Sequence, residues 1–399
     1  AQTGALSWKY NTSDDGPTAA VVEGGYCAFN TESCTVFVLD AKSGKLVWKE
    51  WLGDPLMSQP AIWGGKLYIA YPGGASQGNK KASPPGHRML CADLKTGKHI
   101  WDKPITSDVI SAPIVSSGKL YFSCQDGTSF CLDGTTGKEI FKKADASTSA
   151  PTIAGDKILG TQKFAVGKDE FESISVKDYR GATLAKHNAR KVAFLAPPSP
   201  AATLSSEATS IVGINTAGTV ALDSSVGFST APGSANLSKA KSNIGVTTVV
   251  GGWAYQGSRV AYSPSKSMMV NAQGNKLSGL AYAPSLQSAT NGTIGSGWTA
   301  EAKGGKINEN AQVFAPPSLG KDNMYVVSGQ GHVLSVDQKS GKLKFAYATN
   351  EPMTFQPALA EGNIYVGTSN GMLLCFKTGD ADATDWSGWG GNAQHNKEK

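Results

Sequence analysis

Short apolar runs separated by turn-forming residues occupy most of this chain. In the clearest stretch, Asp126-Gly127 supplies a hairpin turn in the middle of a four-strand pattern. The four runs are residues 112–115, 119–124, 129–132 and 139–142. No 3.6-residue periodicity crosses these runs, so the pattern predicts short antiparallel strands rather than helices.

One phrase, Asp-x-x-(Ser/Thr)-Gly-Lys-x-x-(Trp/Phe), recurs along the chain. Its clear copies begin at Asp40, Asp93, Asp133 and Asp337. Four weaker copies bring the number of units to eight. A proline also begins an apolar run at a constant place in the repeat. Because proline has no N–H to donate to a neighbouring strand, that place suits the start of a strand. Repeating four-stranded units of about 40–50 residues are typical of β-propeller blades.

The repeat predicts an all-β fold: an eight-bladed β-propeller of four-stranded antiparallel blades, forming one domain over residues 1–399. The eighth unit lacks a clear fourth strand, whereas residues 6–10 (LSWKY) resemble the outer strand of unit one. We therefore expect the N-terminal strand to complete the last blade and close the ring; a disordered N-terminal arm is the alternative. The expected blades lie at about 17–51, 56–104, 109–143, 148–187, 190–231, 243–282, 312–348 and 353–378, followed by a C-terminal tail at 379–399.

Composition narrows the class of protein further. Glycine contributes 47 of 399 residues, charged residues 17% and hydrophobic residues 40%, which excludes a disordered chain and a coiled coil. No apolar run approaches the roughly 18 residues of a membrane-spanning helix, so no transmembrane segment is expected. The net charge is +6, but only four of 37 basic residues are arginine, which does not favour nucleic-acid binding.

Six cysteines are present without metal-ligand spacing. Cys27 and Cys34 lie symmetrically about Asn30-Thr31, so a two-residue hairpin turn would place them opposite each other. We therefore expect a disulfide between them, and with it an oxidising compartment. Two reduced, half-buried thiols are the alternative. The pairing of the other four is left open: Cys91, Cys124, Cys131 and Cys375.

The repeated phrase resembles the PQQ-like repeat family, in which Asp-x-x-Thr-Gly-x-x-x-Trp closes each blade. The resemblance runs from about residue 6 to 377 and is strongest in units one to three, seven and eight. It implies that the aromatic residue docks against the Gly-containing turn of a neighbouring blade. The implied docking residues are Trp8, Trp48, Trp101, Phe141 and Phe345.

This family includes dehydrogenases that bind pyrroloquinoline quinone (PQQ) and a metal on the ring axis, and a BamB-like non-enzymatic branch of envelope proteins. The sequence has no adjacent cysteines to form a quinone wall, no acidic metal cage and no nucleophile–base pattern. We therefore expect no catalytic, cofactor-binding or metal residues and no cofactor. A PQQ-dependent dehydrogenase is kept as the alternative.

Two insertions, at 71–88 and 284–312, are expected on one rim of the ring, and an insertion face of a repeat array is often its binding face. Apolar loop residues would join them there or would plug the channel. The candidate protein-binding residues are Met57, Lys80, Lys81, Arg88, Ile110, Trp298, Met353 and Phe355.

These features predict an exported, non-enzymatic scaffold that binds other envelope proteins. It would reside in the periplasm or another extracellular envelope compartment, its signal peptide already removed. A structural subunit of a multi-copy envelope assembly is a second alternative. The partner and the oligomeric state are left open.

Overall fold

The structure is a computed structural model of the chain. It describes residues 8–53, 58–74, 86–191, 210–214, 220–227, 260–281, 297–301, 314–349, 351–378 and 387–396. Within these ranges it omits 13, 15–17, 32, 110–111, 168, 264, 274–275, 329–330, 352, 354–355, 361, 369–372 and 389.

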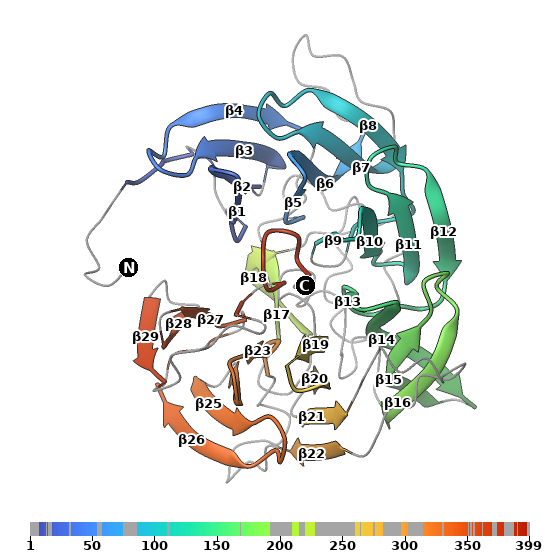
Figure 1. Ribbon diagram of the computed structural model, residues 1–399, viewed down its shortest axis with the longest axis vertical. Coiled ribbons are helices and arrows are strands. Elements are labelled where there is room, and N and C mark those ends of the chain that lie inside the picture. The colour runs from blue at the N-terminus through green and yellow to red at the C-terminus, as the bar shows by residue number, and fades with distance from the viewer. Residues whose placement is uncertain are drawn as a thin grey trace.

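Antiparallel sheets surround a central axis. Figure 1 shows them following one another around a ring in chain order, from β1–β4 to β27–β29, apart from the sheet of β17 and β18. The described residues contain strands but no helix, and hence no helix that could span a membrane. The all-β prediction is therefore confirmed, and four-stranded antiparallel units are confirmed for six of the described sheets.

Three four-stranded sheets come from the first part of the chain, each with its strands in chain order. Their strands are β1 (Val21–Glu23), β2 (Tyr26–Phe29), β3 (Thr35–Asp40) and β4 (Leu46–Trp51); β5 (Ala61–Trp63), β6 (Lys66–Gly73), β7 (Gly86–Asp93) and β8 (His99–Pro104); and β9 (Ile114–Ser116), β10 (Lys119–Ser123), β11 (Thr128–Asp133) and β12 (Glu139–Ala144).

Three further sheets of the described residues have four strands, and two have fewer. The four-stranded ones are β13 (Thr152–Ala154), β14 (Lys157–Val166), β15 (Asp169–Lys177) and β16 (Thr183–Lys191); β19 (Val260–Ser263), β20 (Met268–Gln273), β21 (Lys276–Ala281) and β22 (Gly297–Glu301); and β23 (Ser318–Leu319), β24 (Asn323–Val327), β25 (His332–Asp337) and β26 (Leu343–Ala348). The smaller ones are β17 (Ser210–Ile214) with β18 (Val220–Gly227), and β27 (Ala358–Ala360), β28 (Asn363–Gly367) and β29 (Leu373–Lys377).

Burial falls from the axis outward within a sheet. All three residues of the inner strand β9 are buried, whereas only Phe141 is buried on the outer strand β12. The two middle strands, β10 and β11, are buried along nearly their whole length because neighbouring sheets cover both of their faces. The hydrophobic core is therefore distributed between sheets rather than gathered in one place. Ile114 and Tyr121 of one sheet, for example, share a cluster with Ile153 and Ile158 of the next.

The sheets β13–β16 and β19–β22 contact each other directly, whereas the sequence predicts the fifth unit, 190–231, between them; of that unit the structure describes residues 190–191 and the strands β17 and β18. Thr152 at the start of β13 donates a hydrogen bond from Oγ1 to the carbonyl of Val260 in β19, and the two sheets share a hydrophobic cluster. Figure 1 draws the β17–β18 hairpin of this unit over the centre of the ring rather than on its circumference. The count of eight blades stays a prediction.

The expected Cys27–Cys34 disulfide is wrong: both cysteines are buried, and no disulfide joins them. The strands β2 and β3 pair Cys27 with Leu39, so the connecting loop is longer than the two-residue turn that the prediction assumed. Cys34 belongs to that loop, whose backbone is fixed by a hydrogen bond from the Cys34 N–H to the Thr31 carbonyl (2.9 Å). Thr31 Oγ1 also donates to Asp14 (2.6 Å), and these polar contacts decide the register.

Candidate functional site

Aromatic side chains on the outer strands pack on glycine turns of the following sheet. The ring of Trp48 covers Gly97, where an added Cβ would lie 2.9 Å from the indole and φ is +72°. Its Nε1–H donates to the Leu94 carbonyl (2.8 Å). Only glycine tolerates both the left-handed backbone and this close approach. The same contact recurs for Trp8 on Gly44, Trp101 on Gly137 and Phe141 on Gly181.

Trp298 makes this docking contact too, although the sequence predicted it to bind another protein. It lies on the outer strand β22, its ring covers Gly341, and its Nε1–H donates to the Gln338 carbonyl (2.7 Å). The prediction placed it in a loop because β22 lies apart from the other strands of its unit. Phe345 instead packs against Tyr325 and Tyr347, and Tyr347 in turn stacks on Phe376 of β29.

Two other predicted binding residues are not free surface groups. Met353 is fully buried in the cluster between β23–β26 and β27–β29. Arg88 lies on β7 with its side chain 11% exposed, and its Nε donates to Asp102 Oδ1 across the sheet (2.8 Å). Five predicted binding residues lie outside the described part of the chain: Met57, Lys80, Lys81, Ile110 and Phe355.

A polar cluster, called here the rim cluster, consists of Tyr71, His87, Arg88, Asp102 and Asp108 and flanks the insertion at 71–88. Tyr71 donates to Asp102 (2.6 Å), and burial, together with that carboxylate, raises the pKa of the phenol. His87 Nδ1 lies 2.7 Å from Asp108 Oδ1. Burial alone would lower the pKa of His87, but Asp108 and Asp126 together outweigh burial and the pKa is raised. The cluster is a set of paired charges that fixes the base of the insertion.

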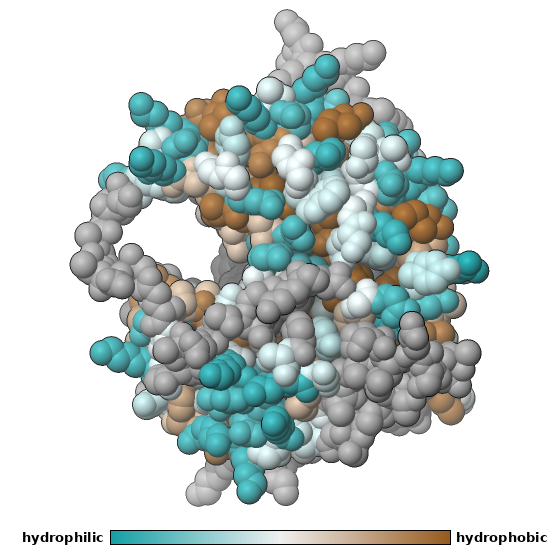
Figure 2. All heavy atoms as spheres, viewed as in Figure 1, coloured by the Kyte–Doolittle hydropathy of each residue, from teal (hydrophilic) through white to brown (hydrophobic). Residues whose placement is uncertain are grey.

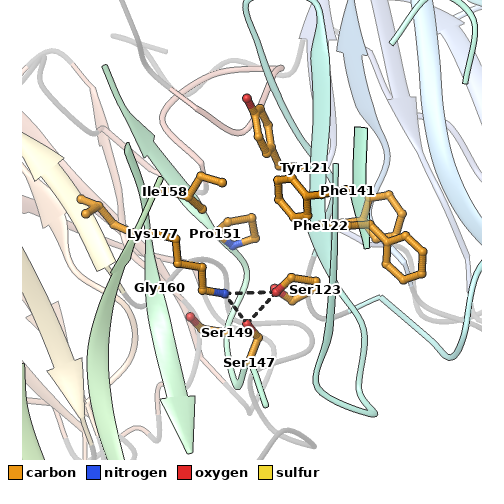
Figure 3. Close-up of a pocket in the computed structure, with 13 residues that line it drawn as sticks. Tyr121, Phe122, Ser123, Phe141, Ser147, Ser149, Pro151, Ile158, Gly160 and Lys177 are labelled. Atoms are coloured by element: carbon orange, nitrogen blue, oxygen red, sulfur yellow. Dashed lines mark hydrogen bonds between the residues drawn. The ribbon is translucent and has the colours of Figure 1, made fainter. Parts of the chain in front are cut away.

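A second polar group lies in a small pocket between the sheets β9–β12 and β13–β16 (Figure 3). Lys177 Nζ donates to Asp145 Oδ2 (2.7 Å), Ser147 Oγ (2.8 Å) and Ser129 Oγ (3.1 Å). Burial lowers the pKa of this lysine, and Asp145 opposes that shift. Because all three Nζ protons are directed to acceptors, Lys177 is not placed to accept a proton from either serine. The cluster therefore joins two sheets and is not a nucleophile–base pair.

Sequence reasoning missed Lys177, although a signal was present. The equivalent positions in the clear repeats, each preceding the aspartate of the phrase, are apolar: Leu39, Ala92, Leu132 and Val336. A lysine at this buried position requires a partner, because an unpaired charge there is costly.

The C-terminal tail fills part of the axis, which the sequence did not predict. The described part of this tail, residues 387, 388 and 390–396, is called the axial segment. His395 and Asn396 are fully buried in it, and its carbonyls accept hydrogen bonds from the inner strands. Burial lowers the pKa of His395 to about 4, although Nδ1 lies 3.1 Å from the Pro113 carbonyl.

The axis does not fit PQQ and its metal. Backbone and buried side chains of the axial segment take up space there, and the residues that the structure describes include no group of three His, Cys, Asp or Glu side chains suited to a metal ion.

The ring of antiparallel sheets, with a docking aromatic carried to the next sheet, defines the chain as a PQQ-repeat β-propeller. The sequence family described as outer membrane protein assembly factor BamB matches residues 1–79, 72–163 and 254–384, which is well over half of the chain. The chain belongs to this family.

Solved structures show the same fold at low sequence identity. BamB from Moraxella catarrhalis has a TM-score of 0.57 and 12% identity, over 94% of this chain and 86% of that one. Sqt1 from Saccharomyces cerevisiae has a TM-score of 0.50 and 11% identity, over 89% of this chain and 82% of that one. The search of curated proteins finds no match.

Proposed function

We propose that this protein is a non-enzymatic scaffold of the cell envelope that binds other proteins during assembly. Membership of the BamB family supports the class, since that family is described as an outer membrane protein assembly factor. The observation that carries the non-enzymatic part is the axial segment. It occupies the ring axis, where quinoprotein relatives would hold their cofactor, with residues that offer no metal cage.

Calorimetric titration of the full chain with PQQ and Ca²⁺ tests this part of the proposal. We expect no heat of binding beyond dilution, and no dye-coupled oxidation of alcohols or glucose. Micromolar or tighter binding, accompanied by such oxidation, would replace the scaffold by the dehydrogenase. A matched titration with Ca²⁺ alone separates metal binding from quinone binding.

The rim that carries the insertion at 71–88 is the proposed binding face. The rim cluster supports this assignment because Asp102 holds both ends of the insertion: it accepts a hydrogen bond from Tyr71 and forms an ion pair with Arg88. Lys80, Lys81 and Met57 remain proposed contacts on this rim, as do Ile110 and Phe355. On the face shown in Figure 2, apolar side chains are interspersed with hydrophilic ones rather than gathered in one apolar patch.

Photo-cross-linking in cells of the source organism tests the binding face. A cross-linker at position 80 or 81 should capture an envelope protein, whereas one at Lys98, on a turn of the sheet β5–β8, serves as the control. Capture from Lys98 alone would leave the scaffold class intact and remove this rim as the binding face.

We also propose that residues 6–10 complete the sheet β27–β29 and close the single propeller. Leu6 and Ser7 lie outside the described residues, and Trp8 and Tyr10 are not in a strand. Among the described strands, β29 is therefore the edge strand of its sheet, and its residue Leu373 is 73% exposed. Trp8 docks on Gly44 of the first sheet, as an outer strand of the preceding blade would.

A further inference from the structure

The inner strands of a propeller present one row of backbone groups to the axis with no strand to pair with. In this chain the axial segment provides partners for several of them. Ile62 of β5 donates to the Ala393 carbonyl (2.8 Å), and Val115 of β9 donates to the Gln394 carbonyl (2.9 Å). Buried N–H groups of this kind would be costly without an acceptor.

Two further contacts extend the set around the axis. The Ile153 N–H of β13 donates to Asn396 Oδ1 (2.8 Å), and the Leu359 N–H of β27 donates to the Ser387 carbonyl (2.6 Å). The segment therefore reaches four sheets at their innermost strands. One of them, β27–β29, is the last sheet of the chain, and the other three are consecutive.

The conformation of the segment is specific rather than extended and adaptable. Gly390 has φ of +62°, and an added Cβ would lie 2.3 Å from the His395 Cα. His395 itself has φ of +55°, which is uncommon for a residue with a side chain. Such a backbone persists only where the surroundings determine it, and here the buried His395 ring lies against Pro113.

We propose that the axis-facing edges of β5, β9, β13 and β27 form a peptide-binding site, and that the axial segment is the ligand this site holds within the folded chain. The site supplies backbone N–H donors. It recognises a short peptide whose backbone carbonyls and one side-chain amide oxygen accept these hydrogen bonds, and whose neutral imidazole is buried. Its occupation connects the last sheet to three earlier sheets across the axis.

Hydrogen–deuterium exchange of the full-length chain tests the proposal at the amides concerned. His395→Ala and Gly390→Ala should raise exchange at Ile62, Val115 and Ile153 by about tenfold or more, with little change on β11. Gln394→Ala is the matched control, because Gln394 contributes its backbone carbonyl and this variant keeps it. Exchange equal to that of the control at all of these amides would overturn the proposal.

Two additional measurements guard against simple misfolding. Asn396→Ala removes one acceptor and should expose the Ile153 amide while Ile62 stays protected; unchanged exchange at Ile153 would contradict the site. A synthetic peptide of residues 387–396, added to the Gly390→Ala chain, should restore protection at about millimolar concentration, the range of a tethered ligand. No restoration at about 10 mM would overturn the claim that the site binds a separable peptide.

Discussion

Trp101 shows at the scale of one residue how a sheet is fixed to the next. It is buried on an otherwise exposed outer strand, it covers Gly137, and its Nε1–H donates to the Gly134 carbonyl (3.1 Å). Its neighbour Ile100 is 45% exposed and makes no such contact on the described surface. The alternation of the strand thus separates a docking residue from a solvent-facing one.

Trp101→Ala should destabilise the protein by about 3–5 kcal/mol, because it removes a large buried ring and a hydrogen bond. Ile100→Ala on the same strand should cost no more than about 0.5 kcal/mol. Urea unfolding followed by circular dichroism measures both as shifts in midpoint. Equal midpoints for the two variants would show that the docking contact does not stabilise the ring.

Lys177 tests how the free-energy cost of burying a charge compares with the gain from pairing that charge. Lys177→Met leaves Asp145 with its side chain 14% exposed and without its cation, which should cost about 3–5 kcal/mol. Lys177→Met combined with Asp145→Asn should recover a large part of that loss, because no uncompensated charge remains. A double variant no more stable than the single one would contradict this account.

At the scale of one element, the axial segment is expected to respond to pH through His395. Its pKa falls from an ordinary 6.5 to about 4 on burial. The docked segment therefore favours the neutral ring: docking is fully stable above about pH 6.5 and weakens as the pH falls towards 4. Between pH 7 and pH 5 the loss should be about 2 kcal/mol.

Amide exchange at Ile62 and Val115, corrected for the intrinsic effect of pH, measures this loss. His395→Gln has no titrating ring and should show no comparable change between pH 7 and pH 5. If the wild-type chain and this variant respond alike, other groups control the stability of the segment.

At the scale of the whole molecule, the N-terminal strand is the element that we propose closes the ring. Outer-strand aromatics lie opposite third-strand residues: Trp101 opposite Cys91 and Phe141 opposite Cys131, both cysteines being buried. Cys375 on β29 has the equivalent position but is exposed. By this register, Trp8 is expected opposite Cys375 in the closed ring.

Deletion of residues 1–10 should lower the melting temperature by on the order of 5–10 °C and accelerate alkylation of Cys375. Deletion of residues 1–5 is the control, since it keeps the strand and should change neither quantity. The other five cysteines are buried and should stay unreactive in both. Alkylation of Cys375 at one rate in all three chains would contradict closure by this strand.

The sequence alone determined the repeating architecture. The phrase beginning at Asp93 combines a turn-forming aspartate, a glycine that accepts a left-handed backbone, and an aromatic four residues later on the next strand. These requirements are local, so they are visible in the order of residues. The strands around Asp133 and the role of glycine beside Trp48 followed from that pattern.

Tertiary structure decided what depends on distant partners. Trp298 looked like a loop residue, but β22 pairs with β21. Cys34 does not face Cys27, because it lies in a longer loop in which its N–H donates to Thr31 and the Thr31 hydroxyl donates to Asp14. The role of the tail was hidden for the same reason. His395 meets Pro113, some 280 residues earlier, only because the ring brings its inner strands to one axis, where their free N–H groups require an acceptor.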